Sequence, residues 1–325
     1  MSDVAVSSSA FARLGRFARD YPIVPLVILL LVLVGILEVM RPGIVNERWI
    51  GNTIKFSIPL AMLAACQTLT MLTGGIDLSA GVVATVSAFV MATLVPLVGA
   101  PAAILLSLVP AILIGLVNGF GVAICRVHPL IMTLGTGLIG TGCLQVYQRF
   151  VIATGSSVPD SLAWLGTGRT LGLPNALLLF VPIAALILYG QRRTGFGRLL
   201  YALGDNENAA RLSGVRSWQV FLALYTLSGL IAGITGLLYV GLIKAPSLSL
   251  ANPLLLPSVA AAVIGGTSIF GGRGGYSGTI VGALILTVLT TMLTLMQMPE
   301  GARRILFGAI ILAVTAVHVR LTENR

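Results

Sequence analysis

Long apolar runs separated by short polar segments dominate this chain from Tyr21 almost to its C-terminal end. A membrane-spanning helix needs about 20 mostly apolar residues. On that rule we expect ten spans, at residues 21–40, 51–73, 78–98, 101–125, 129–152, 174–190, 218–243, 254–270, 276–297 and 303–319. The segment 254–270 is short and rich in glycine, which favours a broken or partly re-entrant helix there. The pattern predicts an all-α polytopic membrane protein with about ten transmembrane helices.

The composition leads to the same fold class. Of the 325 residues, 57% are hydrophobic and only 9% are charged, whereas about a quarter of the residues of a soluble domain are charged. The mean hydropathy is +1.01, and no water-soluble packing could cover this much apolar surface. The 38 glycines suit helices that pack closely in lipid, because small residues let two backbones approach each other.

The net charge of +10 does not indicate a nucleic-acid partner, because the basic residues are spread among the loops. With the N-terminus in the cytoplasm, twelve basic residues lie on the inner side of the membrane and six on the outer side, as the positive-inside rule requires. Both termini are then cytoplasmic. We therefore expect a cytoplasmic segment at 1–20, a transmembrane domain at 21–319 and a cytoplasmic tail at 320–325.

The longest polar segment of the chain is the loop at 191–217, which carries five arginines and lies between two expected spans. Within it, Asp205, Asn206 and Glu207 offer helix-capping side chains, and Gly214 stands where a helix would end. This pattern predicts a helix of about two turns on the cytoplasmic membrane surface. Such a helix either anchors the topology or docks into another protein.

The spans form two blocks of equal length, 51–152 and 218–319, each with four spans. The first block enters the membrane from outside and the second from inside, so the two halves would be inverted repeats. Each contains a glycine-rich turn that leads into a helix of small residues, GGIDLSAG at 74–81 and GGRGGYSG at 271–278. Inverted repeats are common in transporters, with the solute path between them.

No sequence pattern supports catalysis or a bound cofactor. The chain lacks the phosphate-binding motif G-x-x-x-x-G-K-[ST], a nucleophile–base set, paired buried carboxylates and a metal-ligand spacing. The cysteines Cys66, Cys125 and Cys143 stand singly, which indicates packing rather than disulfides or a metal. His128 and His318 lie at expected helix ends and are interpreted as structural. We expect no catalytic residue, no metal site and no enzyme activity in this chain.

The few ionisable residues near the spans, Glu38, Lys55 and Asp77, each have a structural explanation at a span end. No buried carboxylate or histidine relay is evident near mid-membrane, which disfavours a carrier driven by protons or sodium. The remaining mid-span polar residues are neutral, and they either line a path for a hydroxyl-rich solute or bond one helix to another. They are Gln67, Thr68, Thr70, Asn118, Thr133, Thr136 and Gln145.

Three stretches resemble a known family. Residues 72–81 (LTGGIDLSAG) are similar to its signature GGIDLSVG, and residues 115–119 (GLVNG) with 128–136 (HPLIMTLGT) resemble its G-x-x-N-G and P-x-I-x-T-L-G-T. Residues 202–215 (ALGDNENAARLSGV) resemble its A-x-G-x-N-x-x-A-A-x-x-S-G-I. The signature residues are Gly74, Gly75, Asp77, Ser79 and Gly81. The family is that of the inner-membrane permeases of bacterial ABC importers for ribose-, xylose- and arabinose-type monosaccharides.

The likeness runs from about Asn46 to the C-terminus, with mild departures at Ala80 and Asp205. It implies that the polar loop docks on a separate ABC ATPase subunit, which binds ATP and magnesium in place of this chain. The ATPase-coupling residues would be Gly204, Asp205, Asn206, Glu207, Ala209, Ala210, Arg211, Leu212 and Gly214. It also implies a second permease copy, a periplasmic or extracellular solute-binding protein and a location among the lipids of the inner membrane.

The resemblance favours import of a monosaccharide or a similar neutral, polyol-like solute, with Gln67, Asn118, Thr133 and Thr136 as candidate path residues. An ABC permease for a related non-sugar solute (a nucleoside, autoinducer-2 or a branched-chain amino acid) stays open as an alternative. A secondary carrier and a membrane scaffold without transport are two further alternatives. The sequence distinguishes neither one sugar from another nor a homodimeric from a heterodimeric permease.

Overall fold

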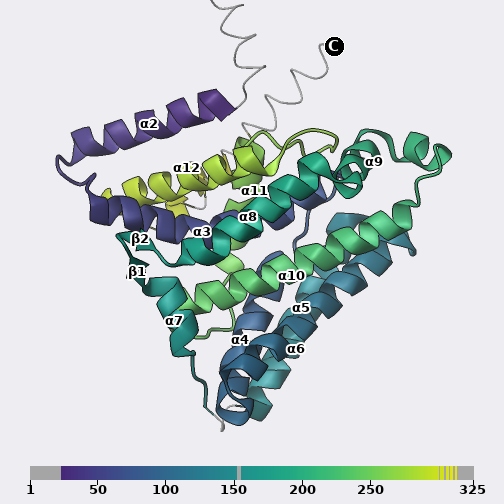
Figure 1. Cartoon of the computed structure of the whole chain (residues 1–325), viewed down its shortest axis with the longest axis horizontal. Helices are drawn as coiled ribbons and strands as arrows, with labels where there is room; N and C mark the ends of the chain where they lie inside the picture. The colour runs from purple at the N-terminus through teal and green to yellow at the C-terminus, as the bar shows by residue number, and fades with distance from the viewer. Residues whose placement is uncertain are drawn as a thin grey trace, which may run out of the picture.

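The computed structural model describes residues 23–151 and 155–299, together with several residues between 301 and 312. Within these ranges the chain is almost wholly helical (Figure 1), and its one sheet is the two-stranded hairpin β1–β2. The elements in order are α2 (Ile23–Met40), α3 (Glu47–Met71), α4 (Ala80–Val98), α5 (Ala100–Ala123), α6 (Pro129–Val151), α7 (Asp160–Thr167), β1 (Arg169–Thr170), β2 (Leu173–Pro174), α8 (Ala176–Arg193), α9 (Gly195–Leu212), α10 (Ser217–Ile243), α11 (Asn252–Ile264) and α12 (Tyr276–Leu295).

Eight of the described helices are long and apolar enough to cross a membrane, namely α2, α3, α4, α5, α6, α8, α10 and α12. They correspond to the first seven expected spans and to the ninth, which confirms the all-α polytopic fold. The expected span at 254–270 overlaps the 13-residue helix α11, which is too short to cross a bilayer alone. The expected span at 303–319 falls mostly outside the described residues, and the segments 1–20 and 320–325 lie wholly outside them.

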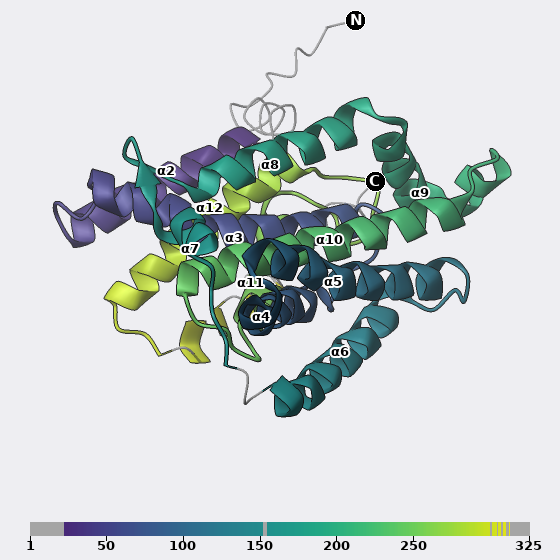
Figure 2. The ribbon, with the colours of Figure 1, turned by 60° about the horizontal axis from the view of Figure 1, so that its bottom comes forward.

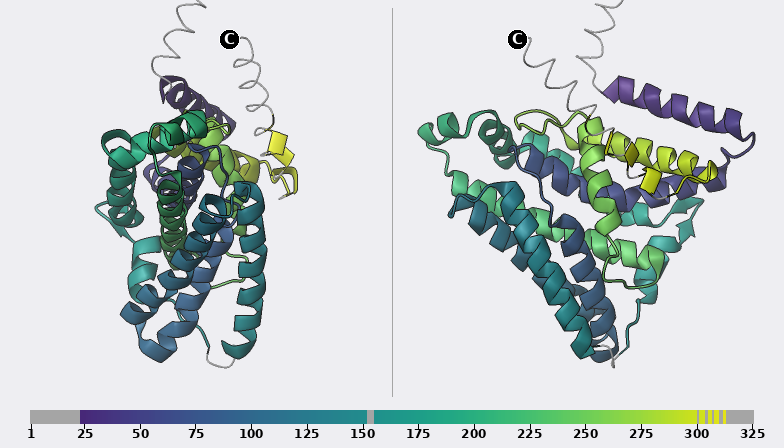
Figure 3. Two further views of the ribbon diagram at one scale, coloured as in Figure 1. Left: turned by 90° about the vertical axis from the view of Figure 1, so that its right-hand side faces the viewer. Right: turned by 180° about the vertical axis from the view of Figure 1, so that it is seen from behind.

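Helix α3 forms the centre of the bundle, and most of its length is buried. It contacts α10, α12, α11 and α8. At one edge, α2 packs on α12 and leaves most of its surface exposed (Figure 3). At another edge, α6 contacts α4 and α5 and stands out from the bundle (Figure 2). The exposed apolar faces of these outer helices suit contact with lipid or with another membrane protein.

Glycines at the helix crossings explain how the helices come so close together. A Cβ atom on Gly236 of α10 would collide with the carbonyl oxygen of Ala84 in α4. A Cβ atom on Gly229 of α10 would come 2.5 Å from the carbonyl oxygen of Ala111 in α5. In lipid, where apolar burial gives little driving force, this close packing of backbones supplies much of the attraction between helices.

Polar contacts connect the elements at the end of the bundle that lies opposite α9. Arg169, on the β hairpin, donates to the carbonyl oxygen of Arg48 at 3.1 Å and to Oδ1 of Asn52 at 2.8 Å, both near the start of α3. The Glu38 carboxylate accepts from the backbone N–H groups of Gly43 and Val45 at 2.6 and 3.0 Å. Glu38 therefore fixes the turn after α2, which agrees with its structural interpretation.

The close crossing of α10 and α4 generates a prediction about stability. Gly236→Ala is expected to lower the melting temperature of the detergent-solubilised protein, because the added methyl group meets the fixed backbone of Ala84. Overpacking of this kind costs about 1–3 kcal/mol. The matched control is Gly142→Ala in α6, where no atom lies within 4 Å of the added group. An equal melting temperature for both variants would contradict this account of the crossing.

Candidate functional site

Residues 72–79 connect α3 to α4, include most of the GGIDLSAG motif and are folded into the protein interior. We call this connection the first glycine-rich turn from here on. Gly74 adopts a left-handed backbone conformation with φ +77°, which glycine reaches without the steric cost of a side chain. A Cβ atom on Gly75 would lie 2.7 Å from the Tyr225 hydroxyl oxygen of α10. The turn therefore needs glycine at one position for its backbone shape and at the next for close packing.

The carboxylate of Asp77 lies at the centre of this turn and is only 2% exposed. Its Oδ1 accepts from the backbone N–H of Ser79 at 3.0 Å and from the Ser79 hydroxyl at 2.6 Å, while Oδ2 accepts from the Ser228 hydroxyl of α10 at 2.7 Å. Burial raises the pKa of the Asp77 carboxyl, and the hydrogen bonds from Ser228 and Ser79 oppose that rise. Ser79 occupies the N-cap position of α4, but its hydroxyl donates to Asp77 and does not cap a backbone N–H group of the helix.

The four candidate path residues belong to the same hydrogen-bonded network. Gln67 donates to the Asp77 carbonyl oxygen at 2.8 Å and accepts from the Asp77 N–H at 3.2 Å. Asn118 donates to the Ser79 hydroxyl at 2.9 Å and accepts from Thr136 at 2.6 Å. The Thr133 hydroxyl accepts from the Leu78 N–H at 3.0 Å.

All four of these side chains are buried, with exposed fractions from 0% to 7%. In this conformation they hold α3, α5 and α6 against the first glycine-rich turn, as the packing interpretation predicts. Their part in a solute path stays a prediction.

The polar loop contains more helix than the sequence predicts. Helix α9 spans Gly195–Leu212, but Asn206 has non-helical angles (φ −157°, ψ 102°) that divide it into two pieces. The side chain of Asn206 accepts from the N–H of Ala209 at 2.9 Å, so it caps the second piece. Gly214, with φ +86°, follows the end of that piece. The expected short helix is present, and a first helical piece that the sequence did not indicate precedes it.

The two pieces of α9 differ in what they contact. The first buries Gly197, Leu200 and Leu203 against the bundle. The second exposes nearly all of its residues, and Ala210 is its one buried member. Leu212, an apolar side chain, is 91% exposed. The exposed predicted coupling residues are Asp205, Asn206, Glu207, Ala209, Arg211, Leu212 and Gly214.

Gly204, at the end of the first piece, joins the polar loop to both glycine-rich turns. A Cβ atom on Gly204 would collide with the carbonyl oxygen of Leu72 and come 2.5 Å from the backbone nitrogen of Gly272. The N–H of Gly272 in turn donates to the carbonyl oxygen of Leu72 at 3.0 Å. We call this meeting of Leu72, Gly204, Gly271 and Gly272 the glycine junction.

Side chains strengthen the attachment of the polar loop to the second glycine-rich turn, at residues 271–278. The Tyr201 hydroxyl donates to the Gly274 carbonyl oxygen at 2.9 Å, and Arg192 donates to the Ser277 hydroxyl at 3.0 Å. Gln191 accepts from the N–H of Tyr276 at 3.0 Å. Burial raises the pKa of Tyr201, and the nearby positive charge of Arg192 opposes the rise.

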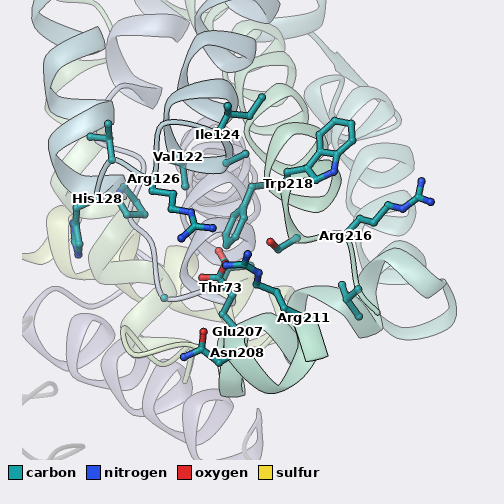
Figure 4. Close-up of a pocket in the computed structure, with 17 residues that line it drawn as sticks. Thr73, Val122, Ile124, Arg126, His128, Glu207, Asn208, Arg211, Arg216 and Trp218 are labelled. Carbon is teal, nitrogen blue, oxygen red and sulfur yellow. The ribbon is translucent and has the colours of Figure 1, made fainter. Parts of the chain in front are cut away.

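A cavity of about 930 Å³ lies between the second piece of α9, the turn from α5 to α6 and the start of α10 (Figure 4). Arg126, His128, Glu207, Arg211 and Trp218 are among the residues that line it. Figure 4 shows the side chains of Arg126, Glu207 and Arg211 directed toward its middle. Among the residues that the structure describes, no group of His, Cys, Asp and Glu is arranged to hold a metal ion.

Several of these contacts could not be located from the sequence. Ser228 is one of several hydroxyl residues in α10, and nothing in its neighbours indicates a partner 151 residues away. Leu72 contributes a backbone carbonyl, for which a sequence carries no signal. The sequence identified Arg126 only as one of the basic residues on the expected cytoplasmic side, and nothing in it indicated a position beside Arg211.

Comparison with known proteins places the chain in a family. The family described as "Branched-chain amino acid transport system / permease component" matches residues 49–315. No solved structure matches the chain significantly.

Several characterised proteins are similar to the chain over most of its length. The ribose import permease protein of Escherichia coli strain K12 is 34% identical over 89% of this chain and 91% of its own. The fructose import permease protein of Rhizobium meliloti is 31% identical over 94% and 87%. The galactofuranose transporter permease protein of Escherichia coli strain K12 is 34% identical over 84% and 81%. This chain is therefore a multi-pass membrane protein that belongs to the branched-chain amino acid transport system / permease component family.

Proposed function

We propose that this chain is the transmembrane permease subunit of an ATP-driven importer for a monosaccharide or a similar neutral, polyol-like solute. The observation that carries the proposal is similarity over 84% to 94% of the chain to permeases named for ribose, fructose and galactofuranose. The family description also mentions branched-chain amino acids, so a related non-sugar solute is the second candidate. The chain is a transport subunit, and ATP and magnesium bind to a separate ATPase.

The exposed second piece of α9 is the proposed contact with that ATPase. It stands out from the bundle, is capped by Asn206, and presents Leu212 with 91% of its surface exposed. Its residues have few intramolecular contacts that docking would have to break.

The glycine junction is the proposed route by which movement of α9 reaches the membrane helices. Leu72 continues directly from the central helix α3, and Gly271 and Gly272 lie between α11 and α12. Because backbone meets backbone there, a displacement of α9 moves both turns without flexible side chains in between. ATP-driven closure of the ATPase pair would in this way rock the two halves of the permease and expose the path alternately to each side.

The remaining partners follow from the same proposal. A second permease copy, the same or related, would complete the path between two exposed faces. A periplasmic or extracellular solute-binding protein would deliver the solute at the β1–β2 end of the bundle, opposite α9. This arrangement places α9 and both termini in the cytoplasm and leaves the chain in the inner membrane of a bacterium.

Uptake measurements test the proposed function. Cells that carry the permease with its ATPase and binding protein are expected to accumulate labelled ribose, fructose or galactofuranose. Depletion of ATP should stop this uptake, and collapse of the proton gradient at constant ATP should leave the uptake rate unchanged. The reverse pattern would make the chain a secondary carrier. Uptake of labelled leucine without uptake of any sugar would assign it to the related solutes.

The docking role of α9 predicts the behaviour of Leu212→Glu. Burial of an unpaired carboxylate in the interface is expected to weaken ATPase co-purification by on the order of 30-fold, which corresponds to about 2 kcal/mol. The amount of permease in the membrane should not change, because Leu212 is already exposed. The control is Leu171→Glu on the β hairpin, where the leucine is 97% exposed at the other end of the molecule. Full ATPase recovery with Leu212→Glu would refute docking through this piece.

The junction predicts a different defect for Gly204→Ala. The added methyl group would push α9 away from Leu72 and Gly272 while leaving the exposed docking piece unchanged. We expect the ATPase to bind and hydrolyse ATP, with solute uptake per ATP reduced at least tenfold in proteoliposomes. Gly195→Ala is the matched control in the same helix, since the nearest atom to its added group is 3.9 Å away. An unchanged ratio of uptake to hydrolysis would remove the junction from the coupling route.

A further inference from the structure

The cavity beside α9 has a basic lining that the proposed function leaves unexplained. Arg126 comes from the turn between α5 and α6, Arg211 from the second piece of α9, and Arg216 from the residue before α10. Within the described chain none of the three guanidinium groups makes a hydrogen bond or an ion pair. Three arginines against the single carboxylate of Glu207 leave the site positively charged.

The arginines converge from separate parts of the chain. Arg126 lies 85 positions before Arg211 (211 − 126), yet both side chains point into one space (Figure 4). Arg216 lines the cavity, although its side chain extends outward in this view. Arg126 also holds a left-handed backbone conformation, with φ 53°, which is uncommon for a residue other than glycine. Two guanidinium groups that face one space can bind one phosphate through paired hydrogen bonds.

An apolar groove adjoins this cavity. It has a volume of about 460 Å³ and runs between α5 and α10, with Ile112, Leu116, Leu222, Ala223 and Leu227 in its lining. Trp218 lines both the groove and the basic cavity. A charged space and an apolar one therefore share a residue and lie next to each other.

The position of this pair of spaces fits the surface of a bilayer. Helix α5 has 24 residues and α10 has 27, so at 1.5 Å per residue they are about 36 and 40 Å long. Both exceed the roughly 30 Å of hydrocarbon, so the ends that line the cavity can reach the level of the lipid headgroups. Tryptophan is enriched at that level because its ring is apolar and its N–H is polar.

We propose that this site binds an anionic phospholipid of the cytoplasmic leaflet. The lipid phosphate lies between Arg126 and Arg211, and an acyl chain follows the α5–α10 groove past Trp218. Basic pockets between transmembrane helices on the cytoplasmic side are suited to anionic headgroups. The assignment to that leaflet rests on the proposed cytoplasmic position of α9. Because Arg211 belongs to the docking piece, the lipid would link that piece to the membrane.

Trp218 allows the occupancy of the site to be measured directly. The full-length permease would carry Trp49→Phe and Trp164→Phe, so that Trp218 is its one tryptophan. Reconstitution into bilayers with brominated phosphatidylglycerol or brominated phosphatidylcholine then reports which lipid lies beside the ring. We expect phosphatidylglycerol to bind at least fivefold more strongly. Arg126→Gln should remove about fivefold of this preference, since one arginine near the surface contributes about that factor.

Three further measurements make the test specific. Arg126→Lys should keep most of the preference, and Arg193→Gln, a basic residue outside the cavity, should keep all of it. Ala223→Phe, which fills the apolar groove without adding a second tryptophan, should lower quenching of Trp218 by both lipids. Equal affinity for the two lipids, or an Arg126→Gln variant with unchanged preference, would overturn the proposal.

Free phosphate compounds and the ATPase are the competing occupants. Release of phosphatidylglycerol by millimolar inorganic phosphate or glycerol 3-phosphate would show that the site takes a soluble phosphate and would overturn the lipid assignment. A loss of ATPase co-purification in Arg126→Gln, without a change in lipid preference, would assign the cavity to the protein interface instead. Lipid selectivity that is insensitive to both phosphates and depends on Arg126 would support the proposal.

Discussion

The close approach of three backbone segments at the glycine junction is the constraint on which the rest of this end of the molecule depends. The carbonyl oxygen of Leu72 accepts from Gly272, and the α carbon of Gly204 lies so near both that no side chain fits. Residues that follow the central helix, the polar loop and the second glycine-rich turn are thereby held in one unit. A bundle with larger residues here would have to separate these segments and fill the gap with flexible side chains.

A second constraint is the burial of the Asp77 carboxylate. Burying a carboxylate is costly unless it accepts enough hydrogen bonds, and Ser79 and Ser228 supply them. Asn118 and Thr136 extend the network toward α5 and α6. The turn between α3 and α4 is therefore linked to three other helices by groups of fixed direction, which favours movement of these elements together. Movement of α6 away from α5 would leave the Thr136–Asn118 bond unmade in a nearly dry interior, at a cost of about 1–3 kcal/mol.

The sequence predicted the fold class, ten spans of which eight are confirmed among the described residues, and the short helix after Asn206, because each depends on local information. Length, hydropathy and capping chemistry are read from neighbouring residues.

The first piece of α9 was missed because Gly195, Gly197 and Gly204 lower helix propensity, while tertiary contacts of Leu200 and Leu203 stabilise it. The motifs identified Asp77 and Gly204 but not the groups that these residues contact. Ser228 reaches Asp77, and the Leu72 carbonyl reaches Gly204, only when the chain folds. The inverted relation of the two halves stays a prediction, although their two glycine-rich turns do meet.

The central position of α3 has a consequence for how the protein is made. Several of its polar groups bond to residues that are synthesised much later. Thr68 bonds to Thr279, which lies 211 residues further along the chain. Asp77, in the turn that follows α3, bonds to Ser228, which lies 151 residues further along. At roughly 5–20 residues per second, the ribosome needs on the order of 10–40 s to supply them. During that interval α3 already lies in or beside the bilayer with those bonds unmade. The helices that cover α3 in the folded protein, α8, α10, α11 and α12, all emerge after it, so the order of synthesis leaves this partly polar helix without its main packing partners until late in translation.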